Sequence, residues 1–209
     1  MNKMCRTNAQ SGRSMIEMLG VLAIIGVLSV GGIAGYSKAM TKYRINKTID
    51  QITQISQNVR MLYGKQRQKN YRNLNTRILY KANLAPKEMF GSGYSMTNAW
   101  GAYFDVGNID DSATFTIATQ IPSEEACIEL ATQDWGSRDT TGLNSIMVTS
   151  NEFPREEEAL GNCSGGIGNG YAVACSGGSN ISVPMPVDVA VDACSANNQG
   201  VAIIFWIFQ

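Results

Sequence analysis

The chain has 209 residues, 44% hydrophobic and 16% charged, which fits one folded domain with or without a long appendage and excludes a disordered tail protein. It contains no histidine, so Ser–His and Cys–His nucleophilic pairs and His-ligated metal sites are excluded, and we expect no enzyme. The net charge is zero, but residues 37–81 carry eleven Lys or Arg and one acid, whereas residues 82–209 carry three basic and fifteen acidic residues.

A membrane span is predicted near the amino terminus. Residues 18–36 include no charged side chain, and as a helix they would be about 28 Å long, which matches the hydrocarbon core of a bilayer. A buried core helix is the alternative, but a segment that is apolar on every face would need protein all round it. The residues before the span are polar and basic, and they lack the apolar region of a cleaved secretory signal.

The edge of this span carries a short motif. Residues 11–17 read Ser-Gly-Arg-Ser-Met-Ile-Glu, so Glu17 is the fifth residue after Gly12. A charge at the centre of a transmembrane helix costs about 2.5–3.5 kcal/mol and normally has a partner. The alternative is that Glu17 reaches the membrane interface, or favours the helix N-terminus through the helix dipole.

The motif resembles the prepilin processing site of type IV pilins and type II secretion pseudopilins. The resemblance implies that prepilin peptidase cleaves after Gly12, that Arg13 becomes the amino terminus and is methylated, and that Glu17 pairs with the amino group of a neighbouring subunit. Members of these families usually begin the mature chain with an apolar residue, and Arg13 is a departure from that pattern.

Helical periodicity continues beyond the span. We predict one helix from Ser14 to about Tyr63, roughly 75 Å long, that ends at Gly64, a natural C′ residue. Its second half offers one apolar stripe to a globular head, with Ile55 beside the stripe: Ile45, Ile49, Ile52, Val59, Leu62 and Tyr63. This arrangement is the ladle shape of the pilin family.

Five glycines lie in the first half of this helix: Gly20, Gly26, Gly31, Gly32 and Gly35. Small residues let helices approach closely in lipid, and Gly31 with Gly35 forms a small-xxx-small pair. We expect lateral packing of many such helices, with local unwinding near Gly26 or near Gly31 and Gly32 in a filament. The ordinary glycine content of a membrane helix is the alternative.

The rest of the chain predicts an α+β head. Residues 71–90 favour an extended loop with a short helix that Pro86 terminates. Residues 122–131 favour a short helix carrying Cys127. Strand patterns occur at 102–106, 113–119, 145–149 and 201–208, and the last is apolar throughout, as expected of a strand covered on both faces. The expected organisation is a leader (1–12), a transmembrane assembly helix (13–36), its amphipathic half (37–64) and a head with an antiparallel sheet (65–209).

Four cysteines follow the span, an even number typical of a disulfide framework in an oxidising compartment. They favour a periplasmic or exterior head, although reduced cysteines in a cytosolic domain are the alternative. Four cysteines allow three pairings. Cys163 and Cys175 flank a Gly-rich turn and can close a local loop, which would leave Cys127 with Cys194. The segment around Cys127, with the late Cys194, resembles the head of type IVb pilins, whose long-range disulfide bounds a variable region.

Other chemistry is not expected. The acidic residues of the second half lack the spacing of a calcium loop, so we predict no metal, and nothing indicates a cofactor. The basic run at 65–81, with Tyr71 and Tyr80, could stack on nucleic acid, but we do not expect a nucleic-acid partner.

The sequence therefore predicts a structural subunit of a type IV pilus, of the IVb kind. Its expected partners are copies of itself, prepilin peptidase, the assembly machinery of the bacterial inner membrane, and a host or bacterial surface. We expect a precursor in the inner membrane with its head in the periplasm, and an extracellular pilus after assembly. The alternatives are a minor pilin or secretion pseudopilin, and a single-span anchored adhesin or binding module that never polymerises.

Overall fold

The computed structural model describes residues 15–66, 70–108, 113–149, 165–168, 171–195 and 201–209. Two compact units make up the chain, residues 1–41 and residues 42–209. The boundary falls within the first helix, α1 (Met15–Tyr63). The predicted cleavage site at Gly12 and Arg13 lies outside the described residues, as does Cys163.

The first unit consists, in its described part, of the amino-terminal portion of α1. Its large apolar side chains are exposed, for example Val27 (74%) and Ile33 (69%). Among the described residues, α1 is the one helix that is long and apolar enough to cross a membrane, judged by length and composition. The predicted helix is confirmed: it begins one residue after Ser14 and ends at Tyr63, where the Gly64 N–H bonds to the Arg60 carbonyl at 2.7 Å.

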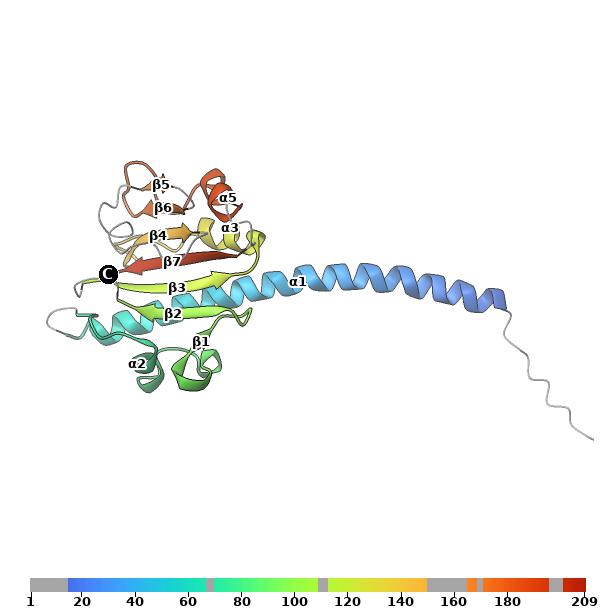
Figure 1. Ribbon diagram of the computed structural model, residues 1–209, viewed down its shortest axis with the longest axis horizontal. Coiled ribbons are helices and arrows are strands. Elements are labelled where there is room, and N and C mark those ends of the chain that lie inside the picture. Colours follow the sequence, from blue (N-terminus) through green and yellow to red (C-terminus); the bar gives the residue numbers. More distant parts are fainter. Residues whose placement is uncertain (1–14, 67–69, 109–112, 150–164, 169–170, 196–200) are drawn as a thin grey trace, which may run out of the picture. The chain divides into compact units, whose positions relative to one another are not determined.

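The second unit contains a seven-stranded sheet in the order β1-β2-β3-β7-β4-β6-β5, with every neighbouring pair antiparallel (Figure 1). The strands are β1 (Met96–Thr97), β2 (Tyr103–Gly107), β3 (Phe115–Ile121), β4 (Leu143–Thr149), β5 (Gly166–Gly168), β6 (Tyr171–Cys175) and β7 (Ala202–Phe208). All four predicted strands are present. The last strand in the chain, β7, occupies the centre of the sheet.

Five short helices accompany the sheet within the described ranges: α2 (Thr76–Lys81), η1 (Lys87–Met89), η2 (Ser92–Tyr94), α3 (Glu124–Thr132) and α5 (Val187–Ser195). Side-chain caps begin two of them, because Asn75 accepts from the Ile78 N–H and Ser123 from the Ala126 N–H. The prediction that Pro86 terminates the short helix is wrong. The helix ends at Lys81, and Pro86 instead precedes η1, where its fixed φ suits the start of a helical turn.

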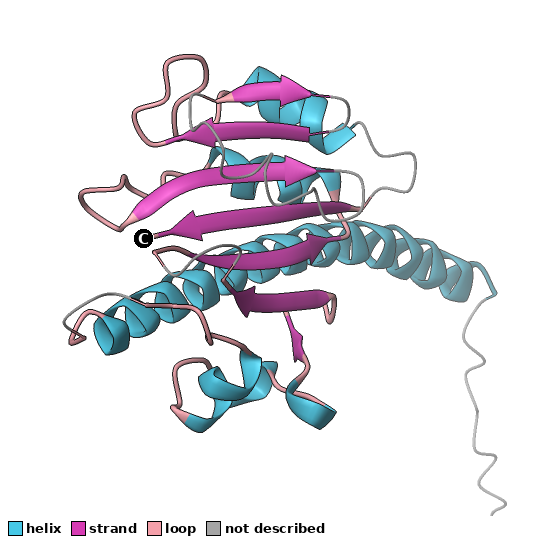
Figure 2. Ribbon diagram, turned by 60° about the vertical axis from the view of Figure 1, so that its left-hand side comes forward, coloured by secondary structure: helices cyan, strands magenta, loops and turns pink. Residues whose placement is uncertain are grey.

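The main core lies between α1 and one face of the sheet (Figure 2). Ile45, Ile52, Ile55 and Val59 of α1 have no exposed surface, and they share this core with Trp206 of β7. These helix residues are seven, three and four positions apart, spacings of one or two helical turns, so they project from one side of α1.

Two details of the predicted stripe change. Ile55, which the sequence places beside the stripe, is fully buried, whereas Leu62 is 40% exposed. Each residue rotates the helix by about 100°, and the buried line that runs from Ile45 through Ile55 to Tyr63 leaves Leu62 on its flank. The stripe therefore lies slightly to one side of its predicted position.

The opposite face of the sheet also carries a buried cluster. Phe205 and Ile207 of β7 pack there with Met147 and Val173, whereas Ile204 and Trp206 face the α1 core. Alternate residues of β7 thus enter two different clusters, as period-two geometry requires. The prediction of a final strand covered on both faces is confirmed.

Candidate functional site

Glu17 lies in the first turn of α1, where a carboxylate is favoured by the helix dipole, and its side chain is exposed. Within the described part of the first unit, no cation forms an ion pair with it. A carboxylate in an apolar helix therefore lacks an ion-pair partner among residues 15–41, the described part of its unit.

The glycines of this unit leave open surface on an unbroken helix. A Cβ placed at Gly20, Gly26, Gly31, Gly32 or Gly35 would meet no atom within 4 Å. The helix runs through all of them without interruption, so local unwinding in a filament stays a prediction. Because glycine has no side chain, another helix can approach the α1 backbone closely at these positions.

Two lysines of α1 have carboxylate partners within the second unit. Lys42 pairs with Glu129 of α3, and Lys47 pairs with Glu88 of η1 at 3.0 Å. In each case the hydrogen bond to the carboxylate is the main factor that raises the pKa of the lysine. Both pairs are exposed, so they contribute little to stability. They do neutralise two cations of the basic segment 37–81 within one chain.

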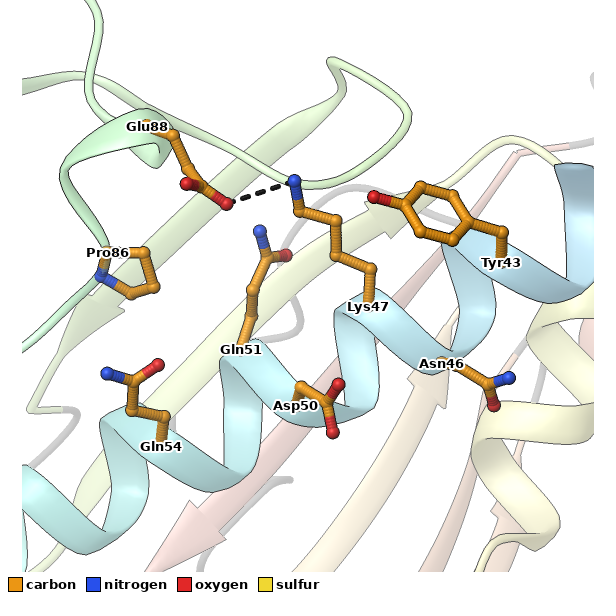
Figure 3. Close-up of a pocket in the computed structure, with 8 residues that line it drawn as sticks. All are labelled: Tyr43, Asn46, Lys47, Asp50, Gln51, Gln54, Pro86 and Glu88. Carbon is orange, nitrogen blue, oxygen red and sulfur yellow. Dashed lines mark ion pairs between the residues drawn. The ribbon is translucent and has the colours of Figure 1, made fainter.

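A polar cavity of about 440 Å³ adjoins the second pair (Figure 3). Its lining comes from α1 and the segment around η1: Tyr43, Asn46, Lys47, Asp50, Gln51, Gln54, Pro86 and Glu88. Gln51 lies between Pro86 and Lys47, is only 4% exposed, and its Oε1 atom has no hydrogen-bond partner. Among the described residues, no group of three or more Cys, Asp or Glu side chains could hold a metal ion, here or elsewhere.

A disulfide joins α3 to α5. Cys127 and Cys194 are bonded, both are almost fully buried, and their Cα atoms are 5.9 Å apart. The Ser195 hydroxyl donates to Glu124 Oε1 at 2.8 Å beside it. The predicted Cys127–Cys194 pair is therefore present, whereas the predicted Cys163–Cys175 pair involves a residue outside the described ranges and stays a prediction.

The surface of α3 and α5 is acidic. Glu124, Glu125, Asp188 and Asp192 are exposed, and the first two lie at the amino-terminal end of a helix, which favours negative charge.

Sequence reasoning found the acidic half of the chain, but it missed the ion pairs of Lys42 and Lys47. These pairs join residues 87 and 41 positions apart, which periodicity cannot reveal.

Comparison with known proteins gives two findings. The family PilS, described as PilS N terminal, matches residues 42–206. The fold is similar to the crystal structure of TcpA, a type IV pilin from Vibrio cholerae El Tor biotype, with a TM-score of 0.50 and 14% sequence identity over 80% of this chain and 99% of that chain. A search of the curated proteins found no match.

Proposed function

The chain belongs to the PilS N-terminal family of type IV pilin-like proteins, and from this membership we propose that it is a structural subunit of a type IV pilus, of the IVb kind. Prepilin peptidase cleaves the precursor after Gly12, and the mature subunit, beginning at methylated Arg13, polymerises through its amino-terminal helix. The observation that carries the proposal is the division of α1 into two parts. The first part exposes its apolar side chains, and the second part packs in a pilin-like head.

The exposed helix gives the subunit two successive environments. In the precursor, the apolar side chains of residues 18–36 face lipid. In the filament, the same side chains face copies of the helix, and the glycines permit the close approach. No catalytic residue or cofactor is needed for this exchange, so the proposed function is structural and not enzymatic.

Glu17 gives the assembly its register. A carboxylate surrounded by apolar side chains requires a partner, and cleavage after Gly12 creates a new cationic amino group on a neighbouring subunit. Pairing of the two charges fixes how far one helix advances along the next. This step concerns a separate copy of the chain, in keeping with the absence of an ion pair to Glu17 within the described part of its own unit.

The disulfide between α3 and α5 supports a head that folds in an oxidising compartment. We therefore place the precursor in the bacterial inner membrane with its head in the periplasm, where the assembly machinery takes it up, and the assembled subunit outside the cell. Adhesion to a host or bacterial surface belongs to the same proposal.

The test is substitution of Glu17 by Val or by Gln, with Asp50→Asn as the matched control, because Asp50 is the other acidic residue of α1 and is exposed. Filaments sheared from cells are quantified by immunoblot, and the cell-bound chain is assayed for an intact Cys127–Cys194 disulfide. Both Glu17 variants are expected to lose surface filaments while the head stays oxidised and folded. The Asp50 variant is expected to assemble normally.

Normal filament yield from the Glu17 variants would contradict polymerisation through the helix and favour an anchored binding module. Mass analysis of wild-type filaments is expected to find a chain that begins at Arg13, and an intact leader in filaments would contradict the processing step. A low share of the chain in sheared filaments, with filaments lost on its deletion, would assign it as a minor pilin.

A further inference from the structure

A second cavity of about 140 Å³ lies in the head and shares no lining residue with the cavity of Figure 3. It is bounded by α1, the segment between α3 and β4, and the end of β7. Its lining is Thr53, Ser56, Gln57, Arg60, Trp135, Thr140, Thr141 and Phe208. Arg60 is the one charged side chain among these lining residues, and it makes the lining electropositive.

Arg60 differs from Lys42 and Lys47 on the same helix. Each lysine has a carboxylate partner, whereas the Arg60 guanidinium has neither an ion pair nor a hydrogen bond in the described part of the chain. Arg60 is partly buried, and a guanidinium carries five N–H donors that cannot be removed by deprotonation. These donors are therefore available to an acceptor that enters the cavity.

The position of this guanidinium is set by packing. Gly142, at φ +75°, leaves the space that it occupies, because a Cβ there would lie 2.7 Å from Arg60 Nε and 2.8 Å from Cζ. The Gly142 carbonyl in turn accepts a hydrogen bond from the Gln209 N–H at 2.8 Å, which ties this backbone to the end of β7. The cation is thus held beside the cavity before any ligand arrives.

Two further donors adjoin it on α1. Thr53, Gln57 and Arg60 are spaced i, i+4 and i+7, which places them on one face of the helix, and the side chains of Thr53 and Gln57 form no hydrogen bond in the described residues. The hydroxyls of Ser56 and Thr141 are already engaged, since they donate to the carbonyls of Thr53 and Trp135 at 2.9 and 2.8 Å.

We propose that this cavity is an oxyanion-binding site. Arg60 holds two oxygens of a carboxylate or phosphate group through its planar fork, and Thr53 and Gln57 donate to the remaining oxygens. A volume of about 140 Å³ accepts an anion of a few heavy atoms, since a water molecule takes up about 30 Å³ in the liquid. The anion comes from solution as phosphate, or from a carboxylate side chain of a second copy. The site does not depend on the proposed function.

The test uses the full chain in neutral detergent micelles, with inorganic phosphate as the probe and chloride at matched ionic strength as the reference. Calorimetric titration is expected to show one saturable phosphate site. Arg60→Gln is expected to weaken it by about tenfold or more, as loss of a charged hydrogen-bond donor implies. Arg77→Gln, an exposed arginine of α2 outside the cavity, is expected to leave the affinity unchanged.

Further variants keep the test decisive if Arg60→Gln fails to fold. Arg60→Lys retains the charge without the bidentate fork and is expected to bind phosphate several-fold more weakly, as is Gln57→Leu, which leaves the cation in place. Circular dichroism establishes that each variant is folded. Wild-type affinity in a folded Arg60 variant, or absence of saturable binding in the wild type, would overturn the site.

Acetate and self-association distinguish the two sources. Competition by acetate, together with phosphate-sensitive self-association in micelles that Arg60→Gln weakens, would assign a carboxylate of a second copy. Phosphate binding that acetate does not displace, with self-association unchanged in Arg60→Gln, would assign a free phosphate ion. Self-association that responds to phosphate equally in wild type and Arg60→Gln would show that the anion acts elsewhere and would overturn the proposal.

Discussion

Removal of the Cys127–Cys194 disulfide is expected to destabilise the head strongly. The bond closes a loop of 67 residues, and the loss of that constraint on the unfolded chain costs about 4.4 kcal/mol by loop-closure entropy. The predicted Cys163–Cys175 bond would close a loop of 12 residues (175 − 163), for which the same relation gives about 2.8 kcal/mol. The long-range bond should therefore stabilise the head by about 1.6 kcal/mol more than the local one.

Paired substitutions test this ranking without leaving an odd thiol. Both members of each pair are changed to Ala in the full chain in micelles, because a Ser at the buried Cys127 or Cys194 would add a hydroxyl without a partner. Thermal unfolding is followed by circular dichroism without reductant. For a domain of this size, a difference of about 1.6 kcal/mol corresponds to about 3 to 6 °C in Tm.

The control is the wild type with and without reductant. Reduction is expected to bring its Tm to that of the variant without any of the four cysteines. An equal or larger loss from the Cys163 and Cys175 pair would refute either the pairing or the entropic account. Strong residual packing of α3 on α5 in the unfolded chain would appear as a smaller loss in both variants.

Three further predictions concern the head. Gly165→Ala should destabilise the head by about 3 kcal/mol and Gly177→Ala by about 1 kcal/mol, as measured by denaturant titration. Both glycines have a positive φ, but only at Gly165 would an added Cβ lie 2.4 Å from the Ile181 carbonyl oxygen. Asn98→Ala should cost about 3 kcal/mol in the same assay, since the Asn98 side chain makes four hydrogen bonds, two within the turn before β2 and two to β3. Partial burial and the neighbouring Asp105 carboxylate raise the pKa of Tyr103 to about 12, so stability should fall between pH 10 and 12, and Tyr103→Phe should flatten that fall.

Each of these has a clear contrary result. Equal losses from the two glycine variants would show that the close approach at Gly165 relaxes without cost. A loss below about 1 kcal/mol in Asn98→Ala would mean that water replaces its hydrogen bonds. The pH prediction follows from the sign of the pKa shift of Tyr103. A folded-state pKa above the usual value of about 10 means that, between pH 10 and 12, the folded chain retains a proton which the unfolded chain has released. An unchanged pH profile in Tyr103→Phe would contradict it.

The sequence predicted the elements of the fold better than their arrangement. The apolar period and Gly64 define α1, and β-branched and aromatic runs define the main strands, because these signals are local. The place of β7 between β3 and β4 is not a local property. The helix α5 was missed because valine at 187, 189 and 191 alternates with acidic or small residues, as in a strand, whereas burial of Ala190, Ala193 and Cys194 at helical spacing decides the structure.

The candidate sites divide in the same way. The motif at Gly12 and Glu17 can be read from sequence because its spacing is local. Arg60 cannot, because its distinguishing property is the lack of an ion pair or hydrogen bond to the described part of the chain, which only the tertiary structure reveals. The sequence shows only that residues 37–81 are basic, whereas tertiary contacts pair Lys42 and Lys47 and leave Arg60 without an ion pair among the described residues.

The central position of β7 has a consequence for how the head folds. Without β7 the sheet consists of two separate three-stranded pieces, β1-β2-β3 and β4-β6-β5, each with an open inner edge. Residues 202–208 join the pieces by pairing with β3 and β4 at once, and the pairing of Phe115 with Phe208 spans 93 positions (208 − 115). Such distant contacts slow folding, and open edges can pair with other chains. A head in which β7 has not yet paired therefore exposes two aggregation-prone edges, and the pairing of β7 removes both.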